Sequence, residues 1–278
     1  MRLRHLVLAA TALLLAACGH AAPTEGDVAD STAGMVQGAE EAMVPMSRDV
    51  EFMVFLHRFS EDADFQMQHI RFPLGKLSYA NFIGEDGDFY PDDFTAKYWC
   101  LYDGEYMRYD GAGYFTWQGD ERIVFDYNSS LLEELWGEFG TSYTFEKIGG
   151  EWYVTGGDYY GSDVGIASSL AQMVEGRNRQ FREEHPGPYT PYVYAGTPGS
   201  YPQASDRLLT EQDLEGLTQK ELRLMRNEIM ARHGYAFKSK ELSEHFNAQP
   251  WYAALFRNVD DRLTDIERAN IAMIKSHE

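Results

Sequence analysis

The sequence has little of three features that whole classes of protein need: cysteine, net positive charge and long apolar runs. Only Cys18 and Cys100 are present among 278 residues. Two distant cysteines form no disulfide framework and no metal cluster, so we predict no metal and no cofactor. The 44 Asp and Glu residues outnumber the 24 Lys and Arg, giving a net charge of -20. This balance excludes nucleic acid as the main ligand, because phosphate binding needs a cationic face.

The sequence also lacks the residue spacings of familiar catalytic sites. It contains neither an HExxH pattern nor the turn that carries a nucleophilic serine. His57 and His69 lie among Glu61, Asp62 and Asp64, which would allow a His/Asp dyad. Solvated helix faces and loops explain these charged residues better, since perturbed sites are few among surface carboxylates. We therefore predict that the protein is not an enzyme.

The most apolar stretch lies at the start of the chain. Arg2 and Arg4 precede an apolar run over residues 6–17. This run is shorter than the roughly 20 residues that cross a bilayer, so it predicts an export signal over residues 1–18.

The end of that run, Leu15-Ala16-Ala17-Cys18, resembles the bacterial lipobox. The resemblance implies that the thiol of Cys18 receives a lipid and that cleavage makes Cys18 the new N-terminus, with the membrane as a partner. Gly19 follows instead of the Asp that often retains such proteins in the inner membrane, which favours the outer membrane. An ordinary signal peptide with a chance cysteine is the alternative.

Composition divides the remaining chain into four segments. Residues 19–47 contain no aromatic residue, and such a segment buries too little apolar surface to offset the entropy of ordering. We predict a flexible tether there. Residues 48–184 are rich in aromatic residues and form a first domain. Proline and glycine make residues 185–204 a semi-extended linker, and residues 205–278 form a C-terminal module.

The first domain is expected to be α+β: helices packed on a curved antiparallel sheet. Phe52, Phe55, Leu56 and Phe59 have helical spacing. Residues 162–184 predict a further helix, with Leu170, Met173, Val174 and Phe181 on its inner side. The predicted strands, joined by turns at Gly119-Asp120 and Gly149-Gly150, cover residues 97–101, 113–118, 122–128, 143–148 and 152–155.

One stretch of this domain carries a family resemblance. Phe59 to Gln68 reads FSEDADFQMQ, and residues 71–74 read RFPL. Together they are similar to a family of exported bacterial domains without assigned function. That resemblance implies a cystatin-like fold, also described as nuclear-transport-factor-like, with a concave face. Such folds host enzymes in some proteins and binding sites in others.

The C-terminal module has clear helix start and stop signals. Thr210 is followed by Asp213, Thr218 by Glu221 and Thr264 by Glu267, each three residues later. These pairs predict capping boxes and helix starts, and the module is expected to be mainly helical. Gly234 is placed as the residue that ends the second of these helices.

Around that glycine, Arg226-Asn227-Glu228-Ile229 and Ala231-Arg232-His233-Gly234-Tyr235-Ala236-Phe237 resemble the YARHG domain, with Phe246 and Trp251-Tyr252 matching later in the pattern. Met230 stands where the family name has Tyr, an exchange that keeps the helix register. The family has no firmly established activity.

Two interpretations of the module's polar residues are open. Arg226, Asn227, Arg232 and His233 would bind an anionic or sugar ligand, or they would tie the helix end to the following segment from inside the fold. Their place on or beside the apolar face favours the structural interpretation, because a buried polar group must find internal partners.

Taken together, these features predict a lipid-anchored envelope protein that acts as a non-catalytic binding or scaffolding module. Peptidoglycan or another envelope protein is the expected partner. A small-molecule carrier or enzyme that uses the concave face of the first domain is the alternative.

Overall fold

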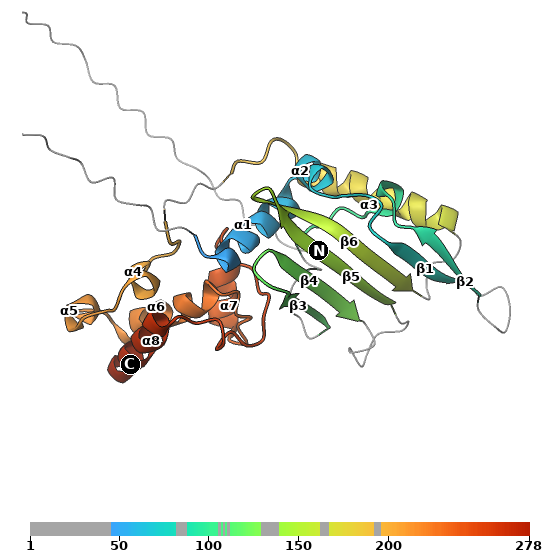
Figure 1. Cartoon of the computed structure of the whole chain (residues 1–278). Coiled ribbons are helices and arrows are strands. Elements are labelled where there is room, and N and C mark those ends of the chain that lie inside the picture. The colour runs from blue at the N-terminus through green and yellow to red at the C-terminus, as the bar shows by residue number, and fades with distance from the viewer. Residues whose placement is uncertain are drawn as a thin grey trace, which may run out of the picture. The chain divides into compact units, whose positions relative to one another are not determined.

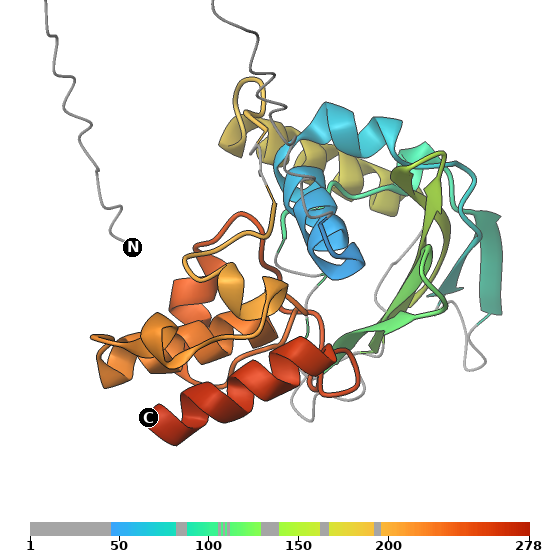
Figure 2. The same ribbon diagram turned by 60° about the vertical axis from the view of Figure 1, so that its left-hand side comes forward.

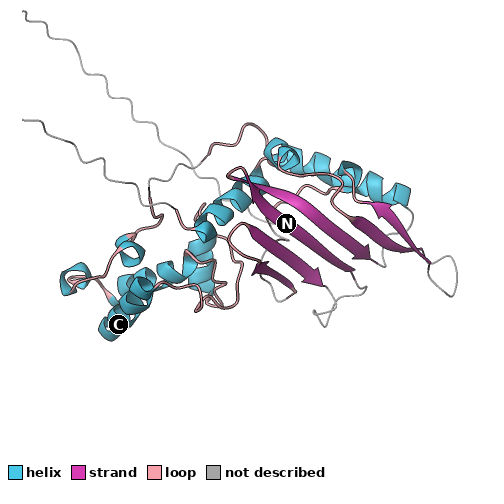
Figure 3. Ribbon diagram, viewed as in Figure 1, coloured by secondary structure: helices cyan, strands magenta, loops and turns pink. Residues whose placement is uncertain are grey.

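The computed structural model describes residues 46–81, 88–104, 107, 109, 112–128, 139–161, 167–191 and 196–278. The predicted signal, Cys18 and nearly all of the predicted tether lie outside these residues. The described residues belong to one compact unit. All of the described strands belong to the first part of that unit, and the C-terminal part consists of helices and loops (Figure 3).

Two helices open the described chain. Helix α1 (Arg48–Glu61) begins at Ser47, whose hydroxyl accepts a hydrogen bond from the Val50 N–H. Helix α2 (Ala63–Gln68) begins at Asp62, whose carboxylate accepts from two backbone N–H groups. These side chains satisfy donors that a helix start leaves free, which explains where both helices begin. The helical spacing of the aromatic residues is confirmed.

A six-stranded sheet follows, in the order β2-β1-β6-β5-β4-β3. The strands are β1 (Lys76–Asn81), β2 (Asp88–Asp93), β3 (Gly113–Trp117), β4 (Arg122–Asn128), β5 (Phe139–Ile148) and β6 (Glu151–Gly161). Neighbours pair antiparallel except β1 and β6, which are parallel, a feature that the sequence did not predict. The sheet curves, and α1, α2 and α3 lie on the same side of it (Figures 1 and 2). The α+β fold class is confirmed.

The hairpin turns lie where glycine was expected to place them. Gly119 has φ +89° between β3 and β4, and Gly149 and Gly150 have φ +61° and +90° between β5 and β6. Positive φ is the conformation that favours glycine over residues with a Cβ. Four of the predicted strands are therefore present, and β5 and β6 extend beyond their predicted bounds.

The predicted strand over residues 97–101 is wrong. A short 3₁₀ helix, η1 (Ala96–Tyr98), begins this segment, and no strand follows it before residue 104. Side chains bond to the backbone of this segment where a neighbouring strand would: Asn178 of α3 accepts from the Leu101 N–H at 2.7 Å and donates to the Trp99 carbonyl at 2.9 Å. Gln66 holds the adjoining residues. Its amide oxygen accepts from the Trp99 indole N–H at 2.7 Å and from the Tyr102 backbone N–H at 2.8 Å, and its amide nitrogen donates to the carbonyls of Phe59 and Tyr102.

Helix α3 (Ala167–Glu184) confirms most of the helix predicted over residues 162–184, whose first five residues lie outside the described chain. Val174 and Phe181 are buried as predicted, whereas Met173 is 44% exposed. Val174, Asn178 and Phe181 follow one another at spacings of four and three, so they share the inner face. Met173 is off that line, and its predicted inward position is wrong. The side chain of Leu170 lies outside the described set.

The C-terminal part contains five helices among its described residues: α4 (Gln203–Asp206), α5 (Glu211–Leu214), α6 (Gln219–Ala231), α7 (Lys240–Asn247) and α8 (Asp265–His277). Capping boxes are present at Thr210/Asp213, Thr218/Glu221 and Thr264/Glu267, as predicted. Each box satisfies backbone donors at a helix start reciprocally. The mainly helical nature of this part is confirmed.

Two groups of buried apolar side chains hold the C-terminal part. One group joins Leu222, Met225 and Ile229 of α6 to Ile274 of α8. The other group is continuous with the core of the α+β part and includes the following C-terminal residues: Ala231, Leu242, Phe246, Trp251, Tyr252, Leu255, Phe256 and Val259. Backbone contacts accompany this packing, since the Tyr109 N–H donates to the Ala254 carbonyl at 2.8 Å. The segment after α6 therefore packs on the first part of the chain.

Candidate functional site

The candidate site starts where α6 ends. Gly234 has φ +73°, and its carbonyl accepts from the N–H groups of Leu255 and Phe256, both at 2.9 Å. A Cβ at this position would lie 3.2 Å from the Cβ of Leu255. Glycine thus allows both the left-handed turn and the close approach of the later segment. This turn fixes the direction in which the preceding residue, His233, points.

His233 lies between two carboxylates from different elements. Its Nδ1 is 2.9 Å from Oδ2 of Asp49 in the first turn of α1, and its Nε2 is 2.9 Å from Oε2 of Glu267 in the first turn of α8. The three side chains are buried, with 6%, 4% and 3% of the residue exposed. Because both ring nitrogens face carboxylate oxygens, the doubly protonated imidazolium fits this position and donates to both.

The electrostatics of the site agree with a charged imidazole. Burial alone would lower the pKa of His233, but the hydrogen bonds to Asp49 and Glu267 and their negative charges raise it to about 9. Burial likewise acts to raise the pKa of Glu267, and the hydrogen bond and charge of His233 outweigh it, so that this pKa is lowered. Opposite charges at hydrogen-bond distance stabilise each other's charged forms.

Arg262 is the fourth member of the cluster. Its Nη2 contacts Oδ1 of Asp49, so that this carboxylate receives two cationic donors on its two oxygens. The guanidinium lies 4.5 Å from the ring centroid of Phe256 and 5.6 Å from that of Trp117. Aromatic faces attract a guanidinium and restrict its orientation. We call Asp49, His233, Arg262 and Glu267 the junction cluster.

A second buried pair lies beside the junction cluster. Glu228 of α6 and Arg232, the residue that follows this helix, form an ion pair with 2% and 3% of their side chains exposed. The Glu228 carboxylate also accepts from the N–H groups of Ser200 and Tyr201, at 2.9 and 2.7 Å, and Arg232 donates to the Pro198 carbonyl at 2.8 Å. The pair therefore holds residues 198–201 against α6.

The structure gives each of the four residues predicted as binding candidates an internal partner. Arg232 and His233 are buried in the contacts described above. Arg226 forms a two-bond ion pair with Glu278, at 2.6 and 3.0 Å, and the Asn227 amide donates to the Arg223 carbonyl at 2.7 Å. This arrangement agrees with the structural interpretation, and binding of an external ligand by these residues stays a prediction.

His57 and His69 do not form a dyad with the acidic residues near them. His57 Nδ1 is 3.3 Å from the hydroxyl of Tyr189, and burial lowers its pKa although Glu61 acts to raise it. His69 Nδ1 is 2.8 Å from the Phe65 carbonyl. One ring thus meets a residue of the predicted linker. The other meets the backbone of α2, and its Nε2 lies 3.8 Å from Oε2 of Glu151 on β6.

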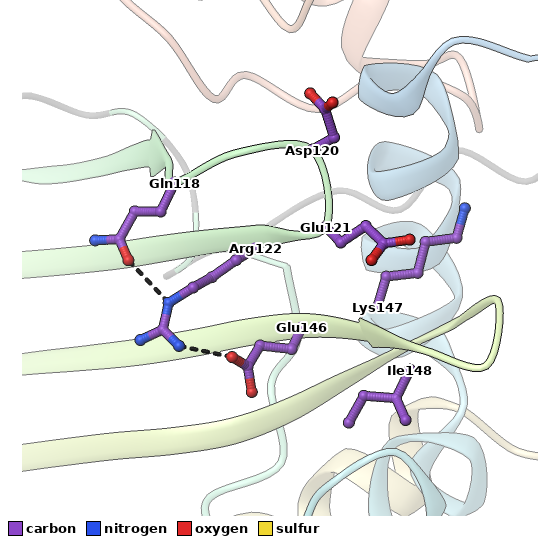
Figure 4. A pocket seen from close by; sticks show the side chains of 7 residues that line it. All are labelled: Gln118, Asp120, Glu121, Arg122, Glu146, Lys147 and Ile148. Atoms are coloured by element: carbon purple, nitrogen blue, oxygen red, sulfur yellow. Dashed lines mark hydrogen bonds and ion pairs between the residues drawn. The ribbon is translucent and has the colours of Figure 1, made fainter.

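An open depression lies at the tips of the two hairpins (Figure 4). Arg122 crosses its floor, where Nε donates to Gln118 at 2.8 Å and Nη1 donates to Glu146 at 2.6 Å. Lys147 at its rim is bonded to Glu51 of α1. Arg122, Glu146, Lys147 and Asp120 are therefore paired with neighbours instead of converging on a common point.

The described residues contain no membrane-spanning helix and no metal-binding group. No described helix has the length and apolar content needed to cross a bilayer. Within the same residues, no group of three or more His, Cys, Asp and Glu side chains is arranged to hold a metal ion.

Sequence reasoning identified the helix end near His233 and missed the roles of Asp49, Glu267 and Arg262 in the junction cluster. The capping box at Thr264 predicted that Glu267 faces the start of α8, but it did not indicate that Glu267 also accepts from His233. Asp49 carried only the weak signal of an acid in a first helical turn. No local pattern marked Arg262.

The comparisons with known proteins identify the C-terminal part. The YARHG domain family matches residues 199–278, so a YARHG domain occupies that range. The match begins at Gly199, within the predicted linker, at the segment that Glu228 and Arg232 hold. A comparison with curated proteins finds no match.

Among solved structures, an NTF2-like protein from Bacteroides fragilis is similar to this chain. The likeness has 22% sequence identity and a TM-score of 0.25, and it covers 43% of this chain and 50% of that protein. The chain thus spans half the length of that relative. The α+β architecture of the first part rests on its own helices and sheet order.

Proposed function

We propose that the protein is a lipid-anchored component of the bacterial cell envelope that acts as a non-catalytic binding or scaffolding protein. The anchor is a lipid on Cys18, and the outer membrane is its location. In this proposal the described unit is a stable platform that binds other envelope components at its surface.

The packing beneath the curved sheet is the observation that carries this proposal. The ring of Phe52, which has no exposed surface, meets the rings of Phe145, Trp152 and Phe115 at centroid distances of 5.3, 5.1 and 5.7 Å. Edge-to-face contacts at such distances are typical of a filled aromatic core. A filled interior favours surface binding over binding in a concave pocket.

The alternative function, a small-molecule carrier or enzyme, needs converging polar groups in that interior. The described side chains under the sheet are mostly aromatic and aliphatic, the buried Gln66 is fully hydrogen-bonded to its neighbours, and the polar depression of Figure 4 lies at the hairpin tips instead. Ligand pockets typically combine an apolar wall with a few convergent polar groups. The packing of Phe52 therefore supports the scaffolding proposal over this alternative.

Attachment of the lipid is tested by metabolic labelling. The full chain is expressed in a Gram-negative host that is fed labelled palmitate, beside the variants Cys18→Ala and Cys100→Ala. We expect label and membrane association in the wild type and in Cys100→Ala, and neither in Cys18→Ala. Label that persists in Cys18→Ala, or that is absent from the wild type, would contradict the anchor.

The partner is tested separately from the anchor. Purified mature protein is incubated with peptidoglycan sacculi and sedimented, and crosslinking in intact cells captures neighbouring proteins. We expect enrichment in one of these two experiments. Protein that stays in the supernatant with sacculi and yields no reproducible crosslinked neighbour would contradict the binding proposal, whether or not Cys18 is lipidated.

A further inference from the structure

The junction cluster divides unequally between the two parts of the chain. His233, Arg262 and Glu267 belong to the YARHG domain, and only Asp49 belongs to α1. The domain therefore presents two cationic donors, Nδ1 of His233 and Nη2 of Arg262, to the two oxygens of one carboxylate. Removal of Asp49 would leave both buried donors without the acceptor that they share.

The two donors are held in place by groups other than Asp49. Glu267 accepts from Nε2 of His233, and it is itself fixed by the N–H and hydroxyl of Thr264, at 2.9 and 3.1 Å. The ring of Phe256, also in the YARHG domain, supports the guanidinium of Arg262. A site whose donors are oriented before the ligand arrives loses less entropy on binding.

Arg262 also has donor capacity that Asp49 does not use. Its Nε is buried and has no hydrogen-bond partner among the described residues. Arginine binds carboxylates most strongly when two of its N–H groups donate to both oxygens in parallel. Asp49 divides its oxygens between Arg262 and His233 because α1 fixes its position. A carboxylate free of α1 is able to turn and accept from Nε as well.

The other charged groups near the cluster have partners of their own. Arg48 pairs with Asp120, Glu51 with Lys147, and Arg232 with Glu228. Asp49 is thus the carboxylate whose removal leaves Nδ1 of His233 and Nη2 of Arg262 without an acceptor.

We propose that His233 and Arg262 form a carboxylate-binding site of the YARHG domain, which Asp49 of α1 occupies within the same chain. The ligand class is a carboxylate carried by the first turn of a helix, and the site docks the domain on the rest of the protein. This assignment stands whether or not the protein is lipid-anchored. Dilute free carboxylates do not displace Asp49, because covalent linkage gives it an effective concentration in the millimolar range or above.

Chemical rescue tests the site. The variant Asp49→Ala removes the carboxylate and leaves space beside the two donors. Its Tm is measured by circular dichroism in sodium formate and in sodium chloride, titrated at matched ionic strength. We expect a rise in Tm that follows the logarithm of the formate concentration above its Kd and recovers about half of the loss, since a ligand that binds only the folded state raises stability with its concentration. The wild type is expected to show the same Tm in both salts.

Two further variants separate the site from general salt effects. Asp120→Ala removes an exposed partner of Arg48 and leaves the junction cluster whole, so formate and chloride should act on it equally. The double variant Asp49→Ala/Arg262→Met keeps the apolar length of the arginine side chain and lacks its donors, so rescue should vanish.

Equal Tm values for Asp49→Ala in formate and chloride would overturn the proposal, as would rescue that survives in the double variant. If Asp49→Ala is unfolded in chloride at 25 °C, the readout is its ellipticity as formate replaces chloride. A formate-dependent return of native ellipticity supports the site, and an unfolded signal in both salts rejects it.

Discussion

His233 Nδ1 lies 2.9 Å from Oδ2 of Asp49, although 184 positions separate the two residues in the sequence. The contact is buried, and it joins the residue before the helix-ending Gly234 to the first turn of α1. A histidine of the YARHG signature is therefore also a contact between that domain and the α+β part. The first consequence of the contact between His233 and Asp49 concerns the stability of the folded protein.

We expect His233→Gln to lower the free energy of unfolding by about 3 kcal/mol, the range in which loss of one partner from a buried ion pair falls. The substitution removes a charge that faces both Asp49 and Glu267. Urea denaturation followed by fluorescence measures the loss. For a unit of this size the corresponding fall in Tm is about 10 °C.

His277→Gln is the matched control for that variant. His277 is also paired with a carboxylate, Glu211, but the pair is on the surface, with 35% and 80% of the side chains exposed. Exposed pairs contribute about 0–1 kcal/mol. If the two variants lost equal stability, burial of the junction cluster would not be the cause.

The stability supplied by His233 should depend on pH. Its pKa is about 9 in the folded protein against an ordinary value of 6.5. Because folding raises this pKa, the contribution is complete below pH 6.5 and is lost as the pH rises through 9. At about 1.4 kcal/mol for each unit, the stability gap between the wild type and His233→Gln should shrink by up to about 3 kcal/mol.

The measurement is urea denaturation of both proteins at pH 6, 7.5, 9 and 10. Subtracting the two curves removes the titration of every group that they share. A gap that stays constant over this range would show that folding does not raise the pKa of His233.

Local sequence signals were sufficient to predict helix starts and a hairpin turn. The boxes at Thr218 and Thr264 and the glycine turn at Gly119 depend on residues within four positions of each other, and the structure contains all three. Such features are fixed by neighbouring backbone donors and by φ. A single sequence therefore reveals them.

Contacts between residues that lie far apart in the sequence could not be predicted from such local signals. The aromatic run over residues 97–101 has strand composition, yet the side chain of Asn178, 77 positions beyond Leu101, bonds to its backbone. Likewise, no spacing rule connects Asp49 to Arg262. Charged residues are common on this chain, and only the fold selects which of them meet. The junction cluster therefore required the structure.

Gly199 should tolerate no side chain. It has φ +113°, and a Cβ there would clash with Oε1 of Glu228. Gly199→Ala would therefore displace the carboxylate that holds residues 200 and 201, in addition to the strain of a positive φ. We expect a loss of about 2–4 kcal/mol, measured by thermal denaturation, since strain and a broken buried pair both contribute.

Gly187→Ala isolates the backbone contribution. Gly187 has φ +101°, but nothing lies within 4 Å of its hypothetical Cβ. This variant should lose about 1 kcal/mol from strain alone. Equal losses at the two positions would indicate that Glu228 moves aside without cost.

Gln66 should be among the least replaceable polar residues of the α+β part. The residue is fully buried, and its amide bonds to the Trp99 indole, the Tyr102 N–H and the carbonyls of Phe59 and Tyr102. Gln66→Leu has similar volume but would leave these groups without partners, each at a cost of about 1–3 kcal/mol. We expect a total loss of about 4 kcal/mol in urea denaturation.

Gln180→Leu, which removes a single exposed bond to Glu184, should change stability by less than about 0.5 kcal/mol. A small loss for Gln66→Leu would mean that residues 97–102 find other hydrogen bonds, which the strand composition of that segment would readily permit.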